Sequence, residues 1–206
     1  NITLMFSMKH YEAVAQAYID GLTYLLENGG DPEKVASVAS FFVSRVDTAV
    51  DKKLAALDDP AAEALMGKVA VANSRVVYQR FKEIFHGQAF AQLQAAGAGR
   101  QRLLWASTST KNPNYPDTLY IDALIGPETV NTMPPETIEA FRDHGHVANT
   151  LEQDVEEARL ILDNLAELRI DLNEVTEQLQ EDGVEAFARS FDALIETIAA
   201  KKASLE

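Results

Sequence analysis

The chain has 206 residues, with 32 acidic side chains against 18 lysines and arginines, a formal net charge of −14. So acidic a protein repels the phosphates of nucleic acids and of anionic lipids, and we expect neither nucleic-acid nor membrane partners. The lack of cysteine excludes disulfides, thiol catalysis and thiolate metal sites, and the lack of a leader or of an apolar run of ~18 residues favours a cytoplasmic protein.

The first segment, Asn1–Ser7, has the pattern of a β-strand. Alternation gives it an apolar face and a largely polar face. In (β/α) barrels the outer strand face packs under helices, and polar groups near the carboxyl end of a strand line a site. The apolar face holds Ile2, Leu4 and Phe6, and the other face holds Asn1, Thr3, Met5 and Ser7.

Helices and one strand are predicted over the next ninety residues. Apolar residues at helical spacing predict a helix over residues 11–26, which Gly29 and Gly30 end. A strand is predicted at Val35–Val43 and a helix from about Asp47. A second, long helix is predicted from Asp59 to the break at Gly97.

Two more strands are predicted, at Arg102–Ser107 and Thr129–Met133. A polar loop, Thr108–Pro116, and a short helix over residues 118–125 separate them. Another helix should begin at Pro135, since proline is favoured in the first turn. The alternation of strands and helices predicts parallel strands joined by crossover helices.

The chain is predicted to be all-helical from Glu152 onward. Its acidic residues there are interpreted as solvated helix faces. Two apolar stripes mark the helices, the first with Val155, Ala158, Leu162, Leu165 and Leu168, and the last with Val184, Phe187, Phe191, Leu194 and Ile198.

Four strand–helix units are too few for a closed barrel, which needs eight and about 250 residues. An isolated half-barrel would expose two edges of parallel strand, which is an aggregation hazard. The sequence therefore describes either a smaller α/β sheet or part of a barrel.

Polar residues gather at consecutive strand ends. Ser40 and Phe42 share one strand face, and Arg45 follows where its guanidinium can bind an anion with two N–H groups. Ser107 begins a hydroxyl-rich loop that reaches Lys111. Singly, such residues usually cap turns, pair at the surface or fill the core. Together, in matching phase, they suggest a pocket for a phosphorylated polyol.

These segments resemble transaldolases, specifically the bacterial group with a long C-terminal helical extension. The resemblance rests on Asn1–Ser7, Ala39–Asp47 and Leu103–Pro113, with Thr129–Pro135 as the final barrel strand. It implies an α/β fold, a (β/α)8 TIM barrel, of which this chain covers about strands five to eight. Residues 1–150 would then be the second half of the barrel, with residues 151–206 as a helical extension packed on it.

The resemblance implies a transaldolase of the pentose phosphate pathway. Such an enzyme moves a dihydroxyacetone unit from sedoheptulose 7-phosphate to glyceraldehyde 3-phosphate through a lysine Schiff base, and yields erythrose 4-phosphate and fructose 6-phosphate. It implies no cofactor and no metal. Asn1 would bond substrate hydroxyls, and Thr3 would hold the catalytic water.

The remaining site residues are also implied by the resemblance. Ser40 would contact the dihydroxyacetone end and Phe42 would form a pocket wall, while Arg45 and Ser107 would hold the substrate phosphate. The commonest pattern has an arginine two residues after that serine, where this chain has Ser109. We therefore expect Lys111 to supply the second cation.

The family's Schiff-base lysine, its acid/base glutamate and an aspartate lie on strands upstream of Asn1. Within the chain only Lys111 follows the carboxyl end of a strand, and we interpret it as a phosphate contact or an exposed side chain. The segment is therefore expected to need the N-terminal half of the barrel for activity. A non-catalytic sugar-phosphate-binding half-barrel and a fructose-6-phosphate-type aldolase stay open as alternatives, as does the oligomeric state.

Overall fold

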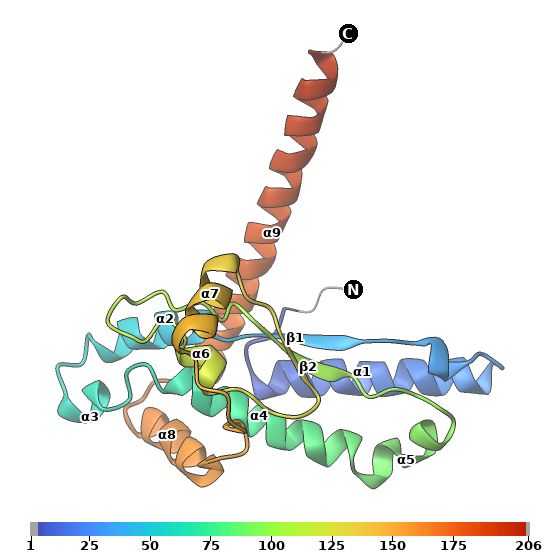
Figure 1. The fold of residues 1–206 in the computed structure, drawn as a ribbon, viewed down its shortest axis with the longest axis horizontal. Coiled ribbons are helices and arrows are strands. Elements are labelled where there is room, and N and C mark those ends of the chain that lie inside the picture. The colour runs from blue at the N-terminus through green and yellow to red at the C-terminus, as the bar shows by residue number, and fades with distance from the viewer. Residues whose placement is uncertain (1–3, 205–206) are drawn as a thin grey trace.

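Three parallel strands form the sheet of the computed structural model, which describes residues 4–204 (Figure 1). They are β1 (Val38–Phe42), β2 (Arg102–Ala106) and β3 (Thr129–Asn131), in the order β1-β2-β3. In the register, Phe42 lies beside Ala106, so β1 and β2 end at the same level. The predicted α/β class with parallel strands is confirmed.

The predicted first strand is much shorter within the described residues. Met5 makes an isolated parallel bridge to Phe41, and Ser7 already caps the following helix, its Oγ accepting the N–H of His10 at 3.2 Å. Met5 is buried and pairs with Phe41 on the face that the helices cover, so the prediction that Met5 shares the largely polar face of the strand was wrong. Asn1 and Thr3 lie outside the described residues.

Helix α1 (Met8–Glu27) ends at Asn28, and Gly29 then takes a positive φ of 75°, as the sequence predicted. A 3-10 turn at Pro32–Lys34 leads into β1, and α2 (Ser44–Leu54) follows that strand directly. Because α2 begins two residues after β1 ends, its first turn lies beside the carboxyl end of the strand.

The long helix predicted from Asp59 to Gly97 is in fact three helices. They are α3 (Pro60–Glu63), α4 (Val69–Phe85) and α5 (Gln88–Ala95). The first break falls at Gly67, which has a φ of +71°. The second falls at Gly87, where a Cβ would lie 2.2 Å from the carbonyl oxygen of Glu83. Apolar periodicity continues through both breaks, and a single long helix was therefore the wrong prediction.

Four helices follow β2: α6 (Leu119–Asp122), α7 (Pro135–His144), α8 (Val155–Glu167) and α9 (Leu172–Ala203). Helix α7 begins at Pro135, as predicted. Helix α8 packs against α4, and α9 contacts α2. The prediction of an all-helical C-terminal region is confirmed over the described residues.

The two faces of β1 differ in burial. Ala39 and Phe41 are buried under helices, with α1 contacting β1 and α4 contacting β2, whereas Ser40 and Phe42 are only partly buried on the opposite face. The main core includes residues of the C-terminal helical region, among them Leu165 and Val175. The sheet is therefore covered on one face, and the other face carries the predicted site residues.

The outer part of α9 projects away from the rest of the molecule (Figure 1). Its apolar stripe is helical, as predicted, but its side chains are between 47% and 62% exposed. No helix within residues 4–204 has the length and apolarity to cross a membrane. We call the exposed stripe the α9 seam, and it consists of Val184, Phe187, Phe191, Leu194 and Ile198.

Candidate active site

The carboxyl ends of β1 and β2 bring four of the predicted residues together. Ser40 and Phe42 alternate along β1 onto its partly buried face. Ser107 follows directly on β2, whose last residue is paired in register with Phe42. Arg45 lies in the first turn of α2. Alternation and parallel pairing thus place all four at one edge of the sheet.

The guanidinium of Arg45 lies over the ring of Phe42, with its Cζ 5.4 Å from the ring centroid. Such a cation–π contact contributes about 0.5–1 kcal/mol at an exposed position. The Phe42 ring is itself supported by Phe6, at a centroid distance of 5.5 Å. A guanidinium held by its face can still donate N–H groups from its edge to a bidentate anion.

Ser107 has a φ of +56°, an unusual left-handed conformation for a residue other than glycine. That conformation costs roughly 1–2 kcal/mol and persists where neighbouring contacts enforce it. Its carbonyl accepts the N–H of Ser44 at 3.0 Å, and the two serine Oγ atoms lie 2.9 Å apart. These contacts fix Ser107 against the first turn of α2.

The next residue, Thr108, links β2 to β3. It is fully buried, and its Oγ1 lies 2.9 Å from both Asn131 Oδ1 and the carbonyl of Thr132. The turn that contains Ser107 is therefore fixed by contacts with α2 on one side of β2 and with β3 and the residue after it on the other. A buried threonine after a strand is too common a pattern for the sequence to have indicated this role.

Lys111 is exposed, and its Nζ donates to Ser109 Oγ at 2.7 Å. It also lines a cleft of about 170 Å³ with Asp47 and Asp51 of α2. Lys111 thus contacts the residue that stands where the family's second arginine is expected, and its role in binding phosphate stays a prediction.

A pair of carboxylates on α2 was missed by the sequence analysis. Asp47 accepts the N–H of Ala70 at 2.7 Å and the hydroxyl of Tyr120 at 2.8 Å. Asp51 lies one helical turn further on, at spacing i,i+4. Two aspartates at that spacing on a helix beside the site were the signal available in the sequence.

Burial raises the pKa of Asp47 from its ordinary value of 3.8 to about 6, although hydrogen bonds from Ala70 and Tyr120 oppose the shift. Burial also raises the pKa of Tyr120, and the charge of Asp47 adds to that effect. Tyr120 therefore stays protonated and can serve as a hydrogen-bond donor to Asp47.

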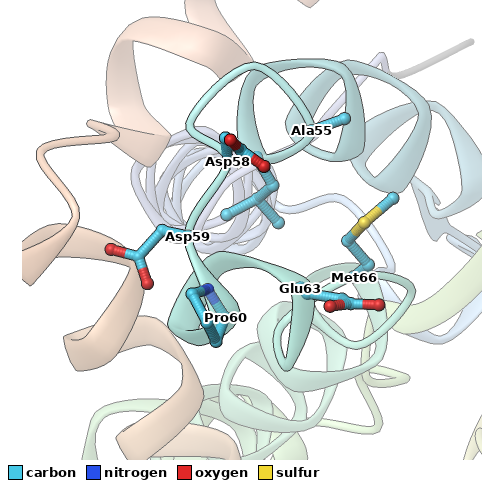
Figure 2. Close-up of a pocket in the computed structure, with 7 residues that line it drawn as sticks. Ala55, Asp58, Asp59, Pro60, Glu63 and Met66 are labelled. Carbon is cyan, nitrogen blue, oxygen red and sulfur yellow. The ribbon is translucent and has the colours of Figure 1, made fainter.

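A different hollow, of about 360 Å³, lies between the end of α2 and α3. Figure 2 shows its lining residues, which include Asp58, Asp59 and Glu63. Asp59 caps α3 by accepting the N–H of Ala61, a structural role. Three carboxylates repel an anionic ligand, and none of the predicted site residues lines this hollow, so its lining is unsuited to a sugar phosphate.

The comparisons with known proteins agree with the resemblance. Residues 1–198 match the family described as transaldolase/fructose-6-phosphate aldolase. The chain is 51% identical to a transaldolase of Parafrankia sp. (strain EAN1pec), over 96% of this chain and 54% of that protein. It is 44% identical to a transaldolase of Trichodesmium erythraeum, over 98% of this chain and 56% of that protein.

The chain belongs to the transaldolase/fructose-6-phosphate aldolase family. The family implies a TIM barrel, to which the parallel sheet and its covering helices conform. The chain spans about half the length of the curated relatives that it matches.

Proposed function

We propose that the complete protein is a transaldolase that transfers a dihydroxyacetone unit from sedoheptulose 7-phosphate to glyceraldehyde 3-phosphate. The observation that carries this proposal is the convergence of Ser40, Phe42, Arg45 and Ser107 at neighbouring strand ends in a chain of this family. The pentose phosphate pathway and a cytoplasmic location belong to the same proposal.

In this proposal the chain supplies substrate binding. Arg45 and Ser107 hold the phosphate, and Lys111 adds a second positive charge. The first turn of α2 favours an anion through its helix dipole. In a chain with a net charge of −14, attraction for a sugar phosphate has to come from such a local group.

The sugar end of the substrate would lie deeper in the barrel. Ser40 contacts the dihydroxyacetone unit and Phe42 forms a wall of the pocket, since both project from the partly buried face of β1. Asn1 binds substrate hydroxyls and Thr3 holds the catalytic water.

We propose that this chain forms strands five to eight of the barrel, with residues 1–150 as its second half. The bridge from Met5 to Phe41 then marks strand five, and β1 to β3 are strands six to eight. The Schiff-base lysine lies on the N-terminal half, which is the partner that the open strand edge at Met5 requires. Residues 151–206 pack on the same barrel.

The α9 seam is covered by that N-terminal half. Gln180 Nε2 donates to the carbonyl of Leu4 at 3.2 Å, and a Cβ on Gly183 would lie 2.6 Å from Leu4 Cδ2. The seam begins at the next residue, Val184. Helix α9 therefore leaves the described core beside the open edge of the sheet. The relatives are longer than this chain, and in this proposal the additional residues pack against the seam.

Borohydride trapping of the full-length protein with fructose 6-phosphate tests the mechanism. We expect one reduced adduct, on a lysine outside these 206 residues, as found by mass spectrometry of the digested protein. An adduct on Lys111 would show that the chain carries its own nucleophile, and no adduct would favour a non-catalytic binding protein.

Adding erythrose 4-phosphate to the same protein separates transfer from simple aldol cleavage. A transaldolase forms sedoheptulose 7-phosphate from fructose 6-phosphate and this acceptor, whereas an aldolase releases free dihydroxyacetone at a rate that does not depend on the acceptor. Transfer in excess of release supports the proposed function over the aldolase alternative.

A further inference from the structure

The loop after β2, residues 107–118, is attached to α2 by side chains that have no role in the proposed chemistry. Asp51 Oδ2 accepts the hydroxyl of Tyr115 at 2.7 Å. Its Oδ1 accepts the N–H of Gly67 at 3.0 Å, in the turn before α4. One carboxylate of α2 thus binds both the loop and the turn that precedes α4.

Asp47 repeats this arrangement one turn earlier. One of its oxygens accepts a backbone N–H at the start of α4, from Ala70, and the other accepts the hydroxyl of Tyr120 in α6, just after the loop. The two aspartates lie on the same face of α2 because they are four residues apart. Together the two pairs hold both the far part of the loop and the helix that follows it.

The ring of Tyr115 fits closely against Gly67. A Cβ at position 67 would lie 2.8 Å from Tyr115 Cζ, and Gly67 has a φ of +71°. Both the space and the backbone conformation therefore require glycine at this position. The close fit of ring and backbone shows that Tyr115 occupies a site shaped for it, and the contact is not an incidental one at the surface.

The loop is also braced internally. Thr110 Oγ1 donates to the carbonyl of Pro116 at 2.8 Å, and the N–H of Tyr115 donates to the carbonyl of Asn112 at 3.1 Å. These hydrogen bonds connect the segment around Tyr115 to the earlier part of the loop, which begins at Ser107.

Helix α2 carries the other half of the proposed phosphate site. Arg45 lies in its first turn, and Ser44 binds Ser107 through the backbone and through Oγ. The same helix thus holds the cation at one end and the anchor of the loop, Asp51, less than two turns further on. A helix of this length is a rigid spacer between the two.

We propose that Tyr115 and Asp51 are positioning residues, which set the loop against α2 so that Ser107 and Arg45 bind one phosphate group together. This inference rests on the proposed function, because it assigns phosphate to that pair. Neither residue is assigned a contact with the substrate, and neither is expected to take part in the chemical step.

The test compares the full-length protein with its Tyr115→Phe variant, which keeps the ring against Gly67 and removes the hydroxyl. We expect the KM for fructose 6-phosphate to rise about three- to tenfold, with kcat within about twofold of the original, because the lost interaction positions a binding group. Tyr24→Phe is the matched control, since Tyr24 is 70% exposed on α1, and both constants should stay unchanged.

Asp51→Asn provides the conservative variant. An asparagine can still hydrogen-bond to both Gly67 and Tyr115, so its KM should stay close to the original value. Asp51→Ala removes both contacts and should raise KM at least as much as Tyr115→Phe. A purely structural role would instead lower the melting temperature of these variants and leave KM unchanged, which would overturn the inference.

Titration with inorganic phosphate separates this inference from the proposed function. We expect Tyr115→Phe to weaken phosphate binding by a similar three- to tenfold factor. If the original protein shows no transfer activity but the variant still weakens phosphate binding, the proposed function fails and the positioning role stands. Equal phosphate affinity in the two proteins, or no phosphate binding by either, overturns the inference.

Discussion

Helix α4 and the outer part of α9 carry similar apolar stripes, but the stripe of α4 is buried and that of α9 is exposed. Phe81 of α4 is fully buried in the core, whereas Phe191 of α9 is 62% exposed. Each lies in a stripe that recurs at three- and four-residue spacing. The comparison shows that periodicity specifies a helix with an apolar face, while the surface that covers that face is decided elsewhere in the protein.

The outer part of α9 would expose an unusually large apolar stripe to solvent if no other surface packed against it. In proteins most helix stability comes from packing an apolar face against another surface, and little comes from helix propensity alone. The exposed apolar seam therefore predicts a surface that packs against it, and we propose that the N-terminal half of the protein provides that surface. Substitutions at Phe81, Asp47 and Phe191 in the full-length protein test this contrast between the two regions.

Phe81→Ala should have the largest effect. We expect it to lower the free energy of unfolding by about 3–5 kcal/mol, because it removes a fully buried ring and leaves a cavity. The Phe81 ring packs against those of Tyr78 and Phe85, with ring centroids 5.7 Å and 5.5 Å away. Urea unfolding measures the change. A loss below about 1 kcal/mol would contradict the role assigned to this core.

Asp47 tests how much free energy of unfolding is lost when a carboxyl group buried in the core becomes ionised. Its pKa of about 6 lies above its ordinary value of 3.8, so between these pH values the folded protein holds a proton that the unfolded chain has released. The resulting stability is fully present below pH 3.8 and is lost as pH rises through about 6. The whole contribution is on the order of 3 kcal/mol.

Asp47→Asn removes this titration. We therefore expect the free energy of unfolding of the original protein, relative to that of the variant, to fall between about pH 4 and pH 6.5. Urea unfolding across this pH range measures the difference. Thr197→Ala on the exposed part of α9 is the control, because it removes no ionisable group, and its difference from the original protein should not change with pH. A pH-independent difference for Asp47→Asn would mean that the burial assigned to Asp47 is wrong.

Phe191→Ala should have the smallest effect of the three. It distinguishes a seam packed against the N-terminal half from a seam packed against a second copy or exposed to solvent. If the N-terminal half covers it, the substitution lowers the free energy of unfolding by about 2 kcal/mol. Arg189→Ala, on the opposite face of α9, should change it by no more than about 0.5 kcal/mol. A loss that depends on protein concentration would instead indicate a second copy on the seam, and no loss would leave the seam exposed.

The placement of four candidate site residues at one edge of the sheet could be predicted because its signals are local. Alternation along β1 placed Ser40 and Phe42 on one face, and the parallel sheet then required Arg45 and Ser107 to lie at the same edge. The breaks at Gly67 and Gly87 could not be predicted in the same way, since the apolar spacing continues across both.

The sequence alone determined the alternation of strands with helical segments, the parallel sheet and the polar groups at its carboxyl edge, because these follow from periodicity and from the geometry of strand pairing. Only the tertiary structure joined Asp51 to Tyr115 and Asp47 to Tyr120, residues 64 and 73 positions apart in the chain. It alone showed that the α9 seam is exposed within the described residues. Contacts between distant segments depend on how whole elements pack, and no local pattern records them.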